Sequence, residues 1–406
     1  MLNGGLEIYN ISYHTEAPHN TKKMPKILRI ITSSFSFYLF RGQMEYISRH
    51  GFEIYASSGR PFDNLNKKEH QEQVKIFKIK HLVRPIRIVS DFIAIIETIR
   101  LIRKLKPDIV HTQTPKAGMV GMFAAWICNV PVRIHTVGGL RLIEEKGVFR
   151  KILDFIERAT YSAATIVLPN SKSLADFIIK NKYASKEKIH VIHNGSTNGV
   201  NLESFSRTPS VMSRANKIQE ELGDGFTYLF VGRIVRDKGI WELIDAFTRL
   251  YGENPHIHLL LVGDFEKKLD PLPEDVYHTI QSHPAIYCAG WQDDVRPWFA
   301  AADALAFPSY REGFPNVVMQ AGAMELPCVV SDINGCNEII IEEENGLIIP
   351  SHDATALYQA MKRMMEDKAL YTHCQQNARP LITSRYNQKD VWQAMLEMYN
   401  DLLPKQ

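Results

Sequence analysis

Several protein classes are excluded by what this chain of 406 residues lacks. Its five cysteines form no CxxC pair and are odd in number, which favours reduced thiols in a cytoplasmic protein over a disulfide framework or a zinc site. The net charge of +3 is too small to indicate nucleic acid, and we expect no nucleic-acid partner. The longest apolar candidate, Ala117–Cys128, is shorter than the ~20 residues that a membrane-spanning helix needs. No apolar h-region of a signal peptide appears near the start.

Hydrophobic residues at 45% and charged residues at 23% describe an ordinary globular protein. Single cores stop growing at ~250–300 residues, so we expect two domains. Short β-rich runs alternate with helical stretches, which indicates βαβ units and parallel sheets. The predicted strands are Lys26–Thr32, Phe52–Ala56, Val74–Ile79, Asp108–Thr112, Val132–Val137, Thr165–Leu168 and Lys188–His193, then Phe226–Val231, His256–Val262, Ala285–Cys288, Ala304–Phe307, Cys328–Val330 and Gly346–Ile349.

A polar stretch, Ser206–Gly225, separates the two series of strands. The fold class is therefore α/β with two successive domains. We predict a loose N-terminal extension over residues 1–23, one Rossmann-like domain over 24–205, a second over 206–384 and a C-terminal helix over 385–406 that can dock on the first domain. Open parallel sheets bind ligands at the carboxyl ends of their strands, and those ends are where chemistry is expected.

The segment YLFVGRIVRDKGI places Arg233 and Lys238 in a loop between a strand end and a helix start. Two cations there make a good diphosphate clamp. Solvent-facing loop charge is an equally supported interpretation. Gly232 and Gly263 each end a strand, where glycine permits a close approach of backbone to ligand.

A single acid, Glu312, follows the strand ALAFPS and precedes the turn Gly313–Asn316. The helix that starts near Asn316 offers free N–H groups to an anion. Glu312 would repel a phosphate but suits the hydroxyl groups of a sugar. Gln320 lies eight residues further, roughly 12 Å along a helix at ~1.5 Å per residue. That span suits a sugar at one end and a ribose at the other, with a diphosphate between them.

Three segments, VGRIVRDKG, AGWQDDVRPWFAAADALAFPS and EGFPNVVMQAGAMELPCVVSDINGCNEII, resemble the donor-binding half of retaining GT-B-fold glycosyltransferases of family GT4. In the first half, FRGQMEYISRHGFEI, KPDIVHTQTPKAG and RIHTVGGLRL are similar to capsule and O-antigen enzymes that extend sugars on polyprenyl diphosphates. The resemblance runs from about Lys26 onward. It implies two Rossmann-like domains facing an interdomain cleft.

The resemblance also implies roles for matching residues in the second half. Arg233 and Lys238 would bind the donor diphosphate, with Gly232 and Gly263 nearby. Glu312 would hold hydroxyls of the transferred sugar, assisted by the backbone of the following turn, which comprises Gly313, Phe314, Pro315 and Asn316. Gln320 occupies the place of a second glutamate that holds ribose hydroxyls. An amide still accepts a hydrogen bond but without charge assistance, so we expect weaker nucleotide affinity or a shifted nucleotide preference.

On the acceptor side, many relatives carry a histidine where this chain has Gly138, and His135 is the nearest candidate for that role. It could bind the sugar or the leaving phosphate, or equally be a strand histidine satisfied by backbone. His111, Lys116 and Arg41 are assigned to the acceptor side, where the first two would face its diphosphate. No metal site is expected, because the Arg–Lys pair replaces a cation, and no cofactor beyond the nucleotide-sugar co-substrate is implied.

The resulting hypothesis is a retaining, metal-independent glycosyltransferase with a UDP-sugar donor and a polyprenyl-diphosphate-linked saccharide acceptor. The sugar is expected to be an N-acetylhexosamine or hexose. Six basic residues would hold the enzyme against the anionic inner face of the plasma membrane, namely Arg84, Arg87, Arg100, Arg103, Lys104 and Lys106. A solvated face of a helix that packs on the core is an equally supported interpretation of these residues. Two alternatives remain open: another GT-B enzyme, such as a UDP-sugar 2-epimerase or a phosphorylase, and a non-catalytic partner subunit. Dehydrogenase chemistry is disfavoured because no G-x-G-x-x-G follows either first strand.

Overall fold

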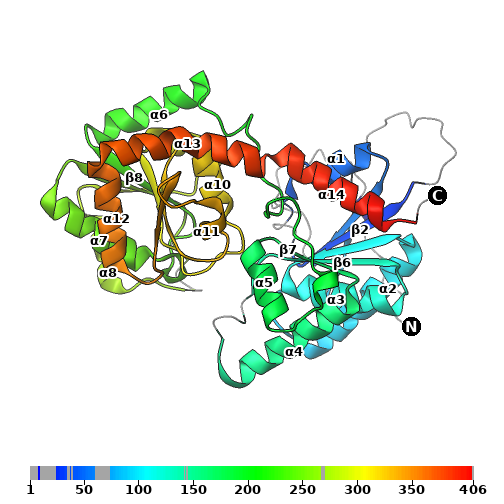
Figure 1. Ribbon diagram of the computed structural model, residues 1–406. Helices are drawn as coiled ribbons and strands as arrows, with labels where there is room; N and C mark the ends of the chain where they lie inside the picture. Colours follow the sequence, from blue (N-terminus) through cyan, green and yellow to red (C-terminus); the bar gives the residue numbers. More distant parts are fainter. Residues whose placement is uncertain are drawn as a thin grey trace. The chain divides into compact units, whose positions relative to one another are not determined.

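The computed structural model describes residues 8–9, 24–33, 37, 40–59, 74–140, 142, 145–266 and 270–404. The chain divides into two compact units, drawn in Figure 1. Unit 1 combines the chain up to Asn198 with the segment from Asp390 onward, and unit 2 is Gly199–Lys389. The sequence placed these divisions at 205 and 384. The divisions in the structure lie elsewhere because Val200 forms a bridge with Asn387. This bridge holds residues 199–205 and 385–389 within unit 2.

Unit 1 is a seven-stranded sheet with the order β1-β4-β3-β2-β5-β6-β7, in which only β1 runs antiparallel to its neighbour. Its elements are β1 (Ile8–Tyr9), β2 (Lys26–Ile31), α1 (Gln43–Arg49), β3 (Glu53–Ser58), β4 (Lys75–Lys78), α2 (Ile88–Leu105), β5 (Ile109–Gln113), α3 (Pro115–Ile127), β6 (Val132–Val137), α4 (Gly147–Ala163), β7 (Ile166–Pro169), α5 (Lys172–Lys180), the 3-10 helix η3 (Lys186–Lys188) and α14 (Gln388–Leu402).

The two faces of this sheet bury different cores. Leu28 and Ile30 of β2 face α2, α3 and α4, whereas Ile27 and Ile31 face α1 and α14. This alternation follows from the two-residue period of a strand. Helix α14, the last of the chain, contributes Met395, Leu396 and Tyr399 to the second core, so the C-terminus completes unit 1.

Unit 2 is a six-stranded parallel sheet with the order β10-β9-β8-β11-β12-β13. Its elements are α6 (Pro209–Leu222), β8 (Phe226–Val231), the 3-10 helix η4 (Arg236–Lys238), α7 (Ile240–Glu253), β9 (Ile257–Val262), α8 (Glu274–Ser282), β10 (Ile286–Gly290), α9 (Arg296–Ala301), β11 (Ala304–Phe307), α10 (Asn316–Ala323), β12 (Cys328–Ser331), α11 (Cys336–Ile339), β13 (Gly346–Ile349), α12 (Ala354–Glu366) and α13 (Lys368–Tyr386). Almost every residue of β8, β9, β11 and β12 is buried, as expected for strands covered on both faces.

One predicted strand is wrong. The segment 188–193 is no strand: it begins at the end of η3 and pairs only through one bridge between Ile189 and Val167. The backbone then turns, since His193 has a φ of +51°. In the predicted loose extension, Ile8 and Tyr9 form the short strand β1 beside β4. The other residues of that extension, 1–7 and 10–23, lie outside the described residues.

Each sheet reverses its strand order at one point. In unit 1 the reversal lies between β2 and β5, and in unit 2 between β8 and β11. The loops that follow the two strands at such a point diverge, and the gap between them is the usual ligand site of an open α/β sheet. These two loop pairs are therefore where the functional residues should gather.

Candidate active site

The loop after β8 brings two cations to the strand reversal of unit 2. Arg233 is exposed, and Lys238 ends η4 just before α7. Gly239 then starts α7 with a φ of +69°, and a Cβ there would lie 2.0 Å from the carbonyl oxygen of Pro308. Glycine is required at this position, and the Lys238 loop therefore packs directly on the chain that leaves β11.

A second glycine contact closes the same edge between β8 and β9. Gly263 follows β9 with a φ of +139°, and a Cβ there would lie 1.9 Å from the carbonyl oxygen of Gly232, which follows β8. No side chain fits between these two turns. Glycine at position 263 is therefore explained by this close packing of the two turns, and the approach of a ligand to Gly232 and Gly263 stays a prediction.

Glu312 lies at the centre of this edge. Its Oε1 is 2.5 Å from the Nζ of Lys238 and accepts a hydrogen bond of 3.1 Å from the hydroxyl of Ser309. The side chains of Lys238 and Glu312 are 13% and 19% exposed, so the pair is shielded but reachable from solvent. The Glu312 carboxylate thus belongs to the loop after β11 and pairs with Lys238 of the loop after β8.

The turn after Glu312 is fixed by the segment that follows β12. The side-chain amide of Asn334 donates to the carbonyl oxygens of Glu312 at 3.3 Å and Gly313 at 2.6 Å. Helix α10 begins two residues beyond Phe314, after Pro315, with no side chain capping its first N–H groups. An anion would satisfy these N–H groups and the positive end of the helix dipole. Asn334 was not identified from the sequence, because nothing in its surroundings marks it as a turn support.

Gln320 lies on α10, and its side chain is partly buried. Its backbone carbonyl accepts a hydrogen bond from Met324, but its side-chain amide has no hydrogen-bond partner within the described residues and is available to a ligand. Phe314 and Pro315 of the preceding turn are buried, while Asn316 is exposed. The structure therefore places Glu312 at the start of the turn and Gln320 on the second turn of the helix, on the same short segment.

Arg233 does not lie in the shielded pair. Its guanidinium is 3.0 Å from Glu266 and 3.8 Å from Asp237, and its side chain is 45% exposed. Asp237 also contacts Arg311, at 3.3 Å. Arg233 is therefore close to the same loops but is partnered by carboxylates at the surface, and it must exchange those partners to bind a diphosphate.

His111 is fully buried in unit 1. One ring nitrogen lies 2.6 Å from the hydroxyl of Tyr399 on α14, and the other lies 2.7 Å from the hydroxyl of Thr136. Burial, together with the nearby charge of Arg29, holds the pKa of His111 well below its usual range. A neutral histidine with both nitrogens occupied is well placed to dock α14, and contact with an acceptor diphosphate remains an untested prediction.

His135 is buried on the other side of the same sheet. Its Nδ1 lies 2.8 Å from the hydroxyl of Thr112, and its ring packs against α3, where a Cβ on Gly118 would lie 2.3 Å from it. Burial lowers the pKa of His135 to about 4. The ring is neutral and enclosed, which favours the interpretation as a satisfied strand histidine. At Gly138, where relatives carry a histidine, the chain is exposed.

The strand reversal of unit 1 is bridged by two threonines. The hydroxyls of Thr32, after β2, and Thr114, after β5, lie 2.7 Å apart. Thr114 has a φ of +79°, a backbone conformation that costs a non-glycine residue ~1–3 kcal/mol and concentrates at functional sites. Neither residue was identified from the sequence as part of a site, although Thr32 ends one predicted strand and Thr114 follows another.

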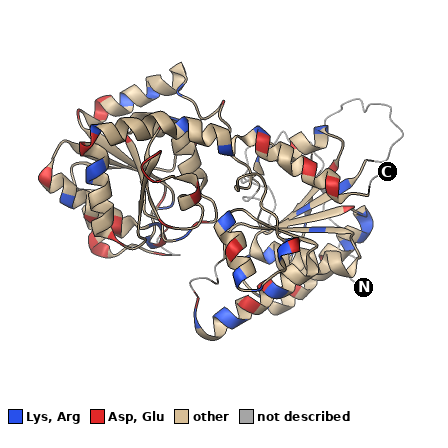
Figure 2. Ribbon diagram, in the orientation of Figure 1, with Lys and Arg blue, Asp and Glu red and all other residues tan. Residues whose placement is uncertain are grey.

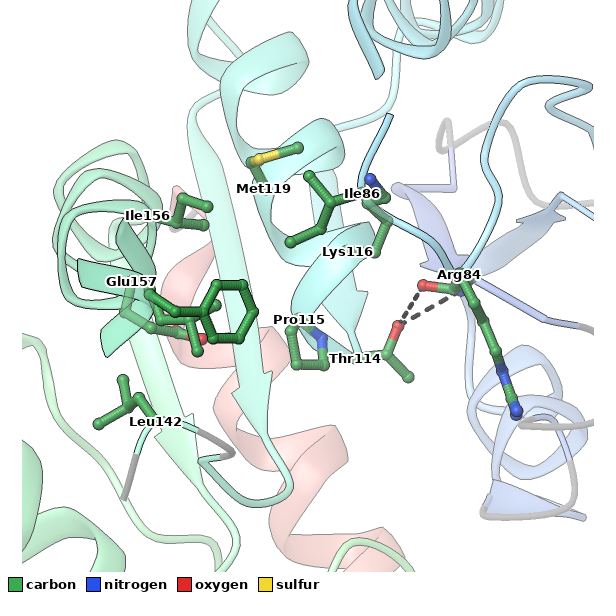
Figure 3. A pocket seen from close by; sticks show the side chains of 12 residues that line it. Arg84, Ile86, Thr114, Pro115, Lys116, Met119, Leu142, Ile156 and Glu157 are labelled. Atoms are coloured by element: carbon green, nitrogen blue, oxygen red, sulfur yellow. Dashed lines mark hydrogen bonds between the residues drawn. The ribbon is translucent and has the colours of Figure 1, made fainter. Parts of the chain in front are cut away.

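A cavity of about 300 Å³ opens beside these threonines (Figure 3). Lys116 lines it, and the Nζ of Lys116 is 2.5 Å from Asp91 of α2. Both side chains are less than a tenth exposed. Lys116 thus lines the cavity in an ion pair with Asp91, and its predicted contact with an acceptor diphosphate stays a prediction. The remaining acceptor-side residue, Arg41, is exposed on the loop before α1, and its carbonyl oxygen accepts a hydrogen bond from Asn198.

Glu157 of α4 lines the same cavity and is buried. Burial raises its pKa to about 7, because an ionised carboxylate loses its hydration there. The sequence shows Glu157 only as one of many charged residues on a helix. Acidic and basic residues are interspersed along α4 (Figure 2), so the sequence of this helix does not indicate that Glu157 faces inward.

Comparison with known proteins links both units to one family. Residues 225–367 match the model of the glycosyl transferases group 1, and residues 44–196 match that of Glycosyltransferase Family 4. The capsular polysaccharide biosynthesis glycosyltransferase CapM of Staphylococcus aureus is 30% identical over 94% of this chain and 98% of its own length. The chain belongs to the family 4 glycosyltransferases.

Further similarities are consistent with that assignment. The UDP-Gal:alpha-D-GlcNAc-diphosphoundecaprenol alpha-1,3-galactosyltransferase of Escherichia coli is 28% identical over 82% of this chain and 85% of its own length. Among solved structures, Anabaena HepE in complex with UDP-glucose aligns with a TM-score of 0.75 over 93% of this chain and 99% of its own, at 19% identity. The predicted GT-B fold, with two Rossmann-like domains, is confirmed. This glycosyltransferase is related to capsule and undecaprenyl-diphosphate-linked sugar transferases.

Proposed function

We propose that this glycosyltransferase moves a hexose or N-acetylhexosamine, with retention of configuration, from a UDP-sugar to a saccharide on a polyprenyl diphosphate, in the synthesis of a surface polysaccharide. The observation that carries the donor half is the Lys238–Glu312 pair. In a nucleotide sugar the diphosphate is bonded directly to the sugar. A site for it needs a cation and a hydroxyl-binding carboxylate next to each other, and this pair supplies both.

The residues around the pair match the remaining parts of the donor. The N-terminus of α10 and the cations Lys238 and Arg233 stabilise the diphosphate. The Gln320 amide accepts from a ribose hydroxyl. UDP fits this assignment, since the structural neighbour HepE was solved with UDP-glucose.

The proposed chemistry requires little from protein acids and bases. The bond between the anomeric carbon and the diphosphate oxygen breaks, and the acceptor hydroxyl oxygen forms a new bond to that carbon on the same face. The hydroxyl proton passes to the leaving diphosphate, which departs as UDP. The protein stabilises the charge that develops on the diphosphate and positions the acceptor, which are the larger contributions in such a reaction.

A lipid-linked acceptor is supported by the E. coli relative, whose name includes diphosphoundecaprenol. The described part of the chain contains no helix both long and apolar enough to cross a bilayer. We infer that the enzyme instead binds an anionic membrane surface through basic residues on and near α2, all of which are exposed: Arg84, Arg87, Arg100, Arg103, Lys104 and Lys106. Flotation with anionic vesicles at low salt should recover the protein with the lipid. Absence of binding there contradicts the membrane inference.

The function itself is tested with purified protein, a panel of UDP-sugars and a polyprenyl-diphosphate saccharide. Mass spectrometry should detect the acceptor extended by one sugar, and NMR of the product should show the anomeric configuration of the donor. Epimerised free UDP-sugar would support an epimerase instead. Absence of turnover with every donor would support a non-catalytic subunit.

A further inference from the structure

The cavity at the strand reversal of unit 1 has one polar side and one apolar side. The polar side comprises Thr32, Thr114 and Arg84, next to the N-terminus of α3. The apolar side comprises Met119 of α3, Leu142, and Phe149, Leu153 and Ile156 of α4. In Figure 3, Arg84 and Thr114 lie on one side of the cavity and Leu142 and Ile156 on the other. Its volume of about 300 Å³ is at the lower end of the ~300–1,000 Å³ typical of ligand pockets.

Exposed apolar side chains continue from this cavity over the surface. Ile86 and Phe149 line the cavity and are also 55% and 38% exposed. Helix α4 also exposes Val148, Ile152 and Phe155, beside its residues that line the cavity. Helix α2 exposes Ile88, Val89 and Phe92 at its start. Large apolar side chains exposed in such number on the two helices that pack against α3 indicate a surface that binds a partner.

The positive charges near the cavity opening indicate what kind of molecule the cavity binds. Arg84 and Arg87 are exposed on the segment that leads into α2, and within the described residues neither guanidinium forms an ion pair. The capless N-terminus of α3 adds positive potential at the polar side. An occupant should therefore have an anionic head and an apolar chain.

We propose that this cavity binds the part of the acceptor where the isoprenoid chain meets the diphosphate. The diphosphate lies against Arg84, Thr114 and the start of α3, and the first isoprene units lie between Met119, Phe149 and Leu153. The exposed apolar residues of α2 and α4 surround the path by which the chain leaves toward the bilayer. This inference rests on the proposed polyprenyl-diphosphate acceptor and assigns it a site.

Glu157 lies in the wall of this cavity, so its charge affects which part of the acceptor can lie beside it. Its buried position raises its pKa to about 7, so a large share of Glu157 is neutral near neutral pH. A neutral carboxyl group can line an apolar chain, whereas a diphosphate directly beside an ionised Glu157 would be repelled. This places the diphosphate at the Thr114 side, away from α4.

Binding is tested on the full chain with farnesyl diphosphate, using calorimetry and thermal shift. Farnesyl diphosphate should bind the wild-type protein, and Phe149→Ser and Leu153→Asn should each weaken binding at least ten-fold. The matched control is Trp126→Ser, an exposed aromatic residue at the opposite end of α3, which should bind as the wild type does. Circular dichroism verifies that each variant is folded. Equal binding of farnesyl diphosphate by all four proteins overturns the inference.

Head-group selectivity distinguishes an acceptor site from a general apolar surface. Inorganic diphosphate and farnesol should each bind at least ten-fold more weakly than farnesyl diphosphate. If octyl glucoside displaces farnesyl diphosphate as readily as farnesyl diphosphate itself does, the cavity is an unselective apolar site and the inference fails.

A transfer assay separates this inference from the proposed function. The ratio of kcat/KM for a saccharide diphosphate with a long isoprenoid chain to that with a methyl group should fall at least ten-fold in Phe149→Ser and remain constant in Trp126→Ser. A constant ratio in an active Phe149→Ser enzyme overturns the cavity assignment and leaves the transferase intact. Tight, variant-sensitive binding of farnesyl diphosphate without transfer of any sugar overturns the proposed function and leaves the cavity assignment intact.

Discussion

Lys238 Nζ lies 2.5 Å from Glu312 Oε1, although the two residues are 74 positions apart in the chain. The contact joins the loops that follow β8 and β11, the two strands on either side of the strand reversal. A carboxylate that repels phosphate is thereby held beside the cation that would attract it. The sugar and diphosphate portions of one substrate can bind to neighbouring side chains for this reason.

Removing the Lys238 cation should stop transfer with little effect on folding. Lys238→Ala and Arg233→Ala should each lower kcat at least ~100-fold, which is the order of magnitude for losing one group that stabilises developing charge. The control is Lys362→Ala, which breaks the exposed ion pair with Glu253 in the same unit and should leave kcat unchanged. Steady-state kinetics with a UDP-sugar measures both. Near-normal turnover of Lys238→Ala would mean that the clamp is wrongly assigned.

Restoring an acid on α10 should alter nucleotide binding more than catalysis. Gln320→Glu should remain active and lower the KM for the UDP-sugar, because a carboxylate accepts a stronger hydrogen bond from a ribose hydroxyl than an amide does. Gln281→Glu, on α8, introduces the same charge elsewhere in unit 2 and should leave the KM unchanged. A complete loss of activity in Gln320→Glu would refute the ribose assignment.

Glu157 should make the protein less stable as the pH rises. Its pKa is about 7 in the folded state against 4.5 for the ordinary group, so the folded state binds the proton more tightly. The free energy of unfolding should therefore fall between pH 4.5 and 7, by about 3 kcal/mol at most. His135 opposes this trend, since its pKa of about 4 costs stability as the pH falls below 6.5. The difference between the wild type and Glu157→Gln isolates the glutamate.

Urea denaturation at several pH values measures this difference. Glu157→Gln should be more stable than the wild type at pH 7.5, and the advantage should shrink toward pH 5. A pH-independent difference would show that Glu157 is ionised in both states or neutral in both.

The hydroxyl of Tyr399 should stabilise unit 1 out of proportion to its size. It accepts a hydrogen bond of 2.8 Å from Arg29 and lies 2.6 Å from His111, and all three residues are buried. Tyr399→Phe leaves both partners short of a hydrogen bond and should cost about 1–3 kcal/mol in the free energy of unfolding. Tyr46→Phe is the control, because its hydroxyl donates to Gln393 of the same helix α14 but at an exposed position. Equal effects of the two substitutions would argue against the buried network.

Sequence patterns predicted the buried parallel strands closely, because their apolar runs are a direct consequence of helices on both faces. The strand predictions failed where the structure of a segment depends on the strand it pairs with rather than on its own composition. Residues 188–193 contain apolar side chains but pair with β7 through a single bridge, and β1 is too short for any pattern to indicate it. Local sequence does not contain that information.

Part of the candidate site could likewise be predicted from the sequence. Glu312 and Lys238 could be found because each lies at a strand end with a recognisable context. The environments of His111 and Glu157 could not, because they depend on Tyr399, which is 288 residues from His111, and on the burial of one face of α4. Burial raises the pKa of Glu157 and lowers that of His111, and the local sequence indicates neither shift.

The contribution of α14 to unit 1 has a consequence for synthesis on the ribosome. The first 198 residues emerge early but lack Met395, Leu396 and Tyr399, which cover one face of their sheet. Unit 2 is contiguous and can fold as soon as Lys389 has left the exit tunnel. The part of the protein translated first is thus the last to be completed, and a nascent chain stalled before α14 would expose an unfinished apolar face to chaperones.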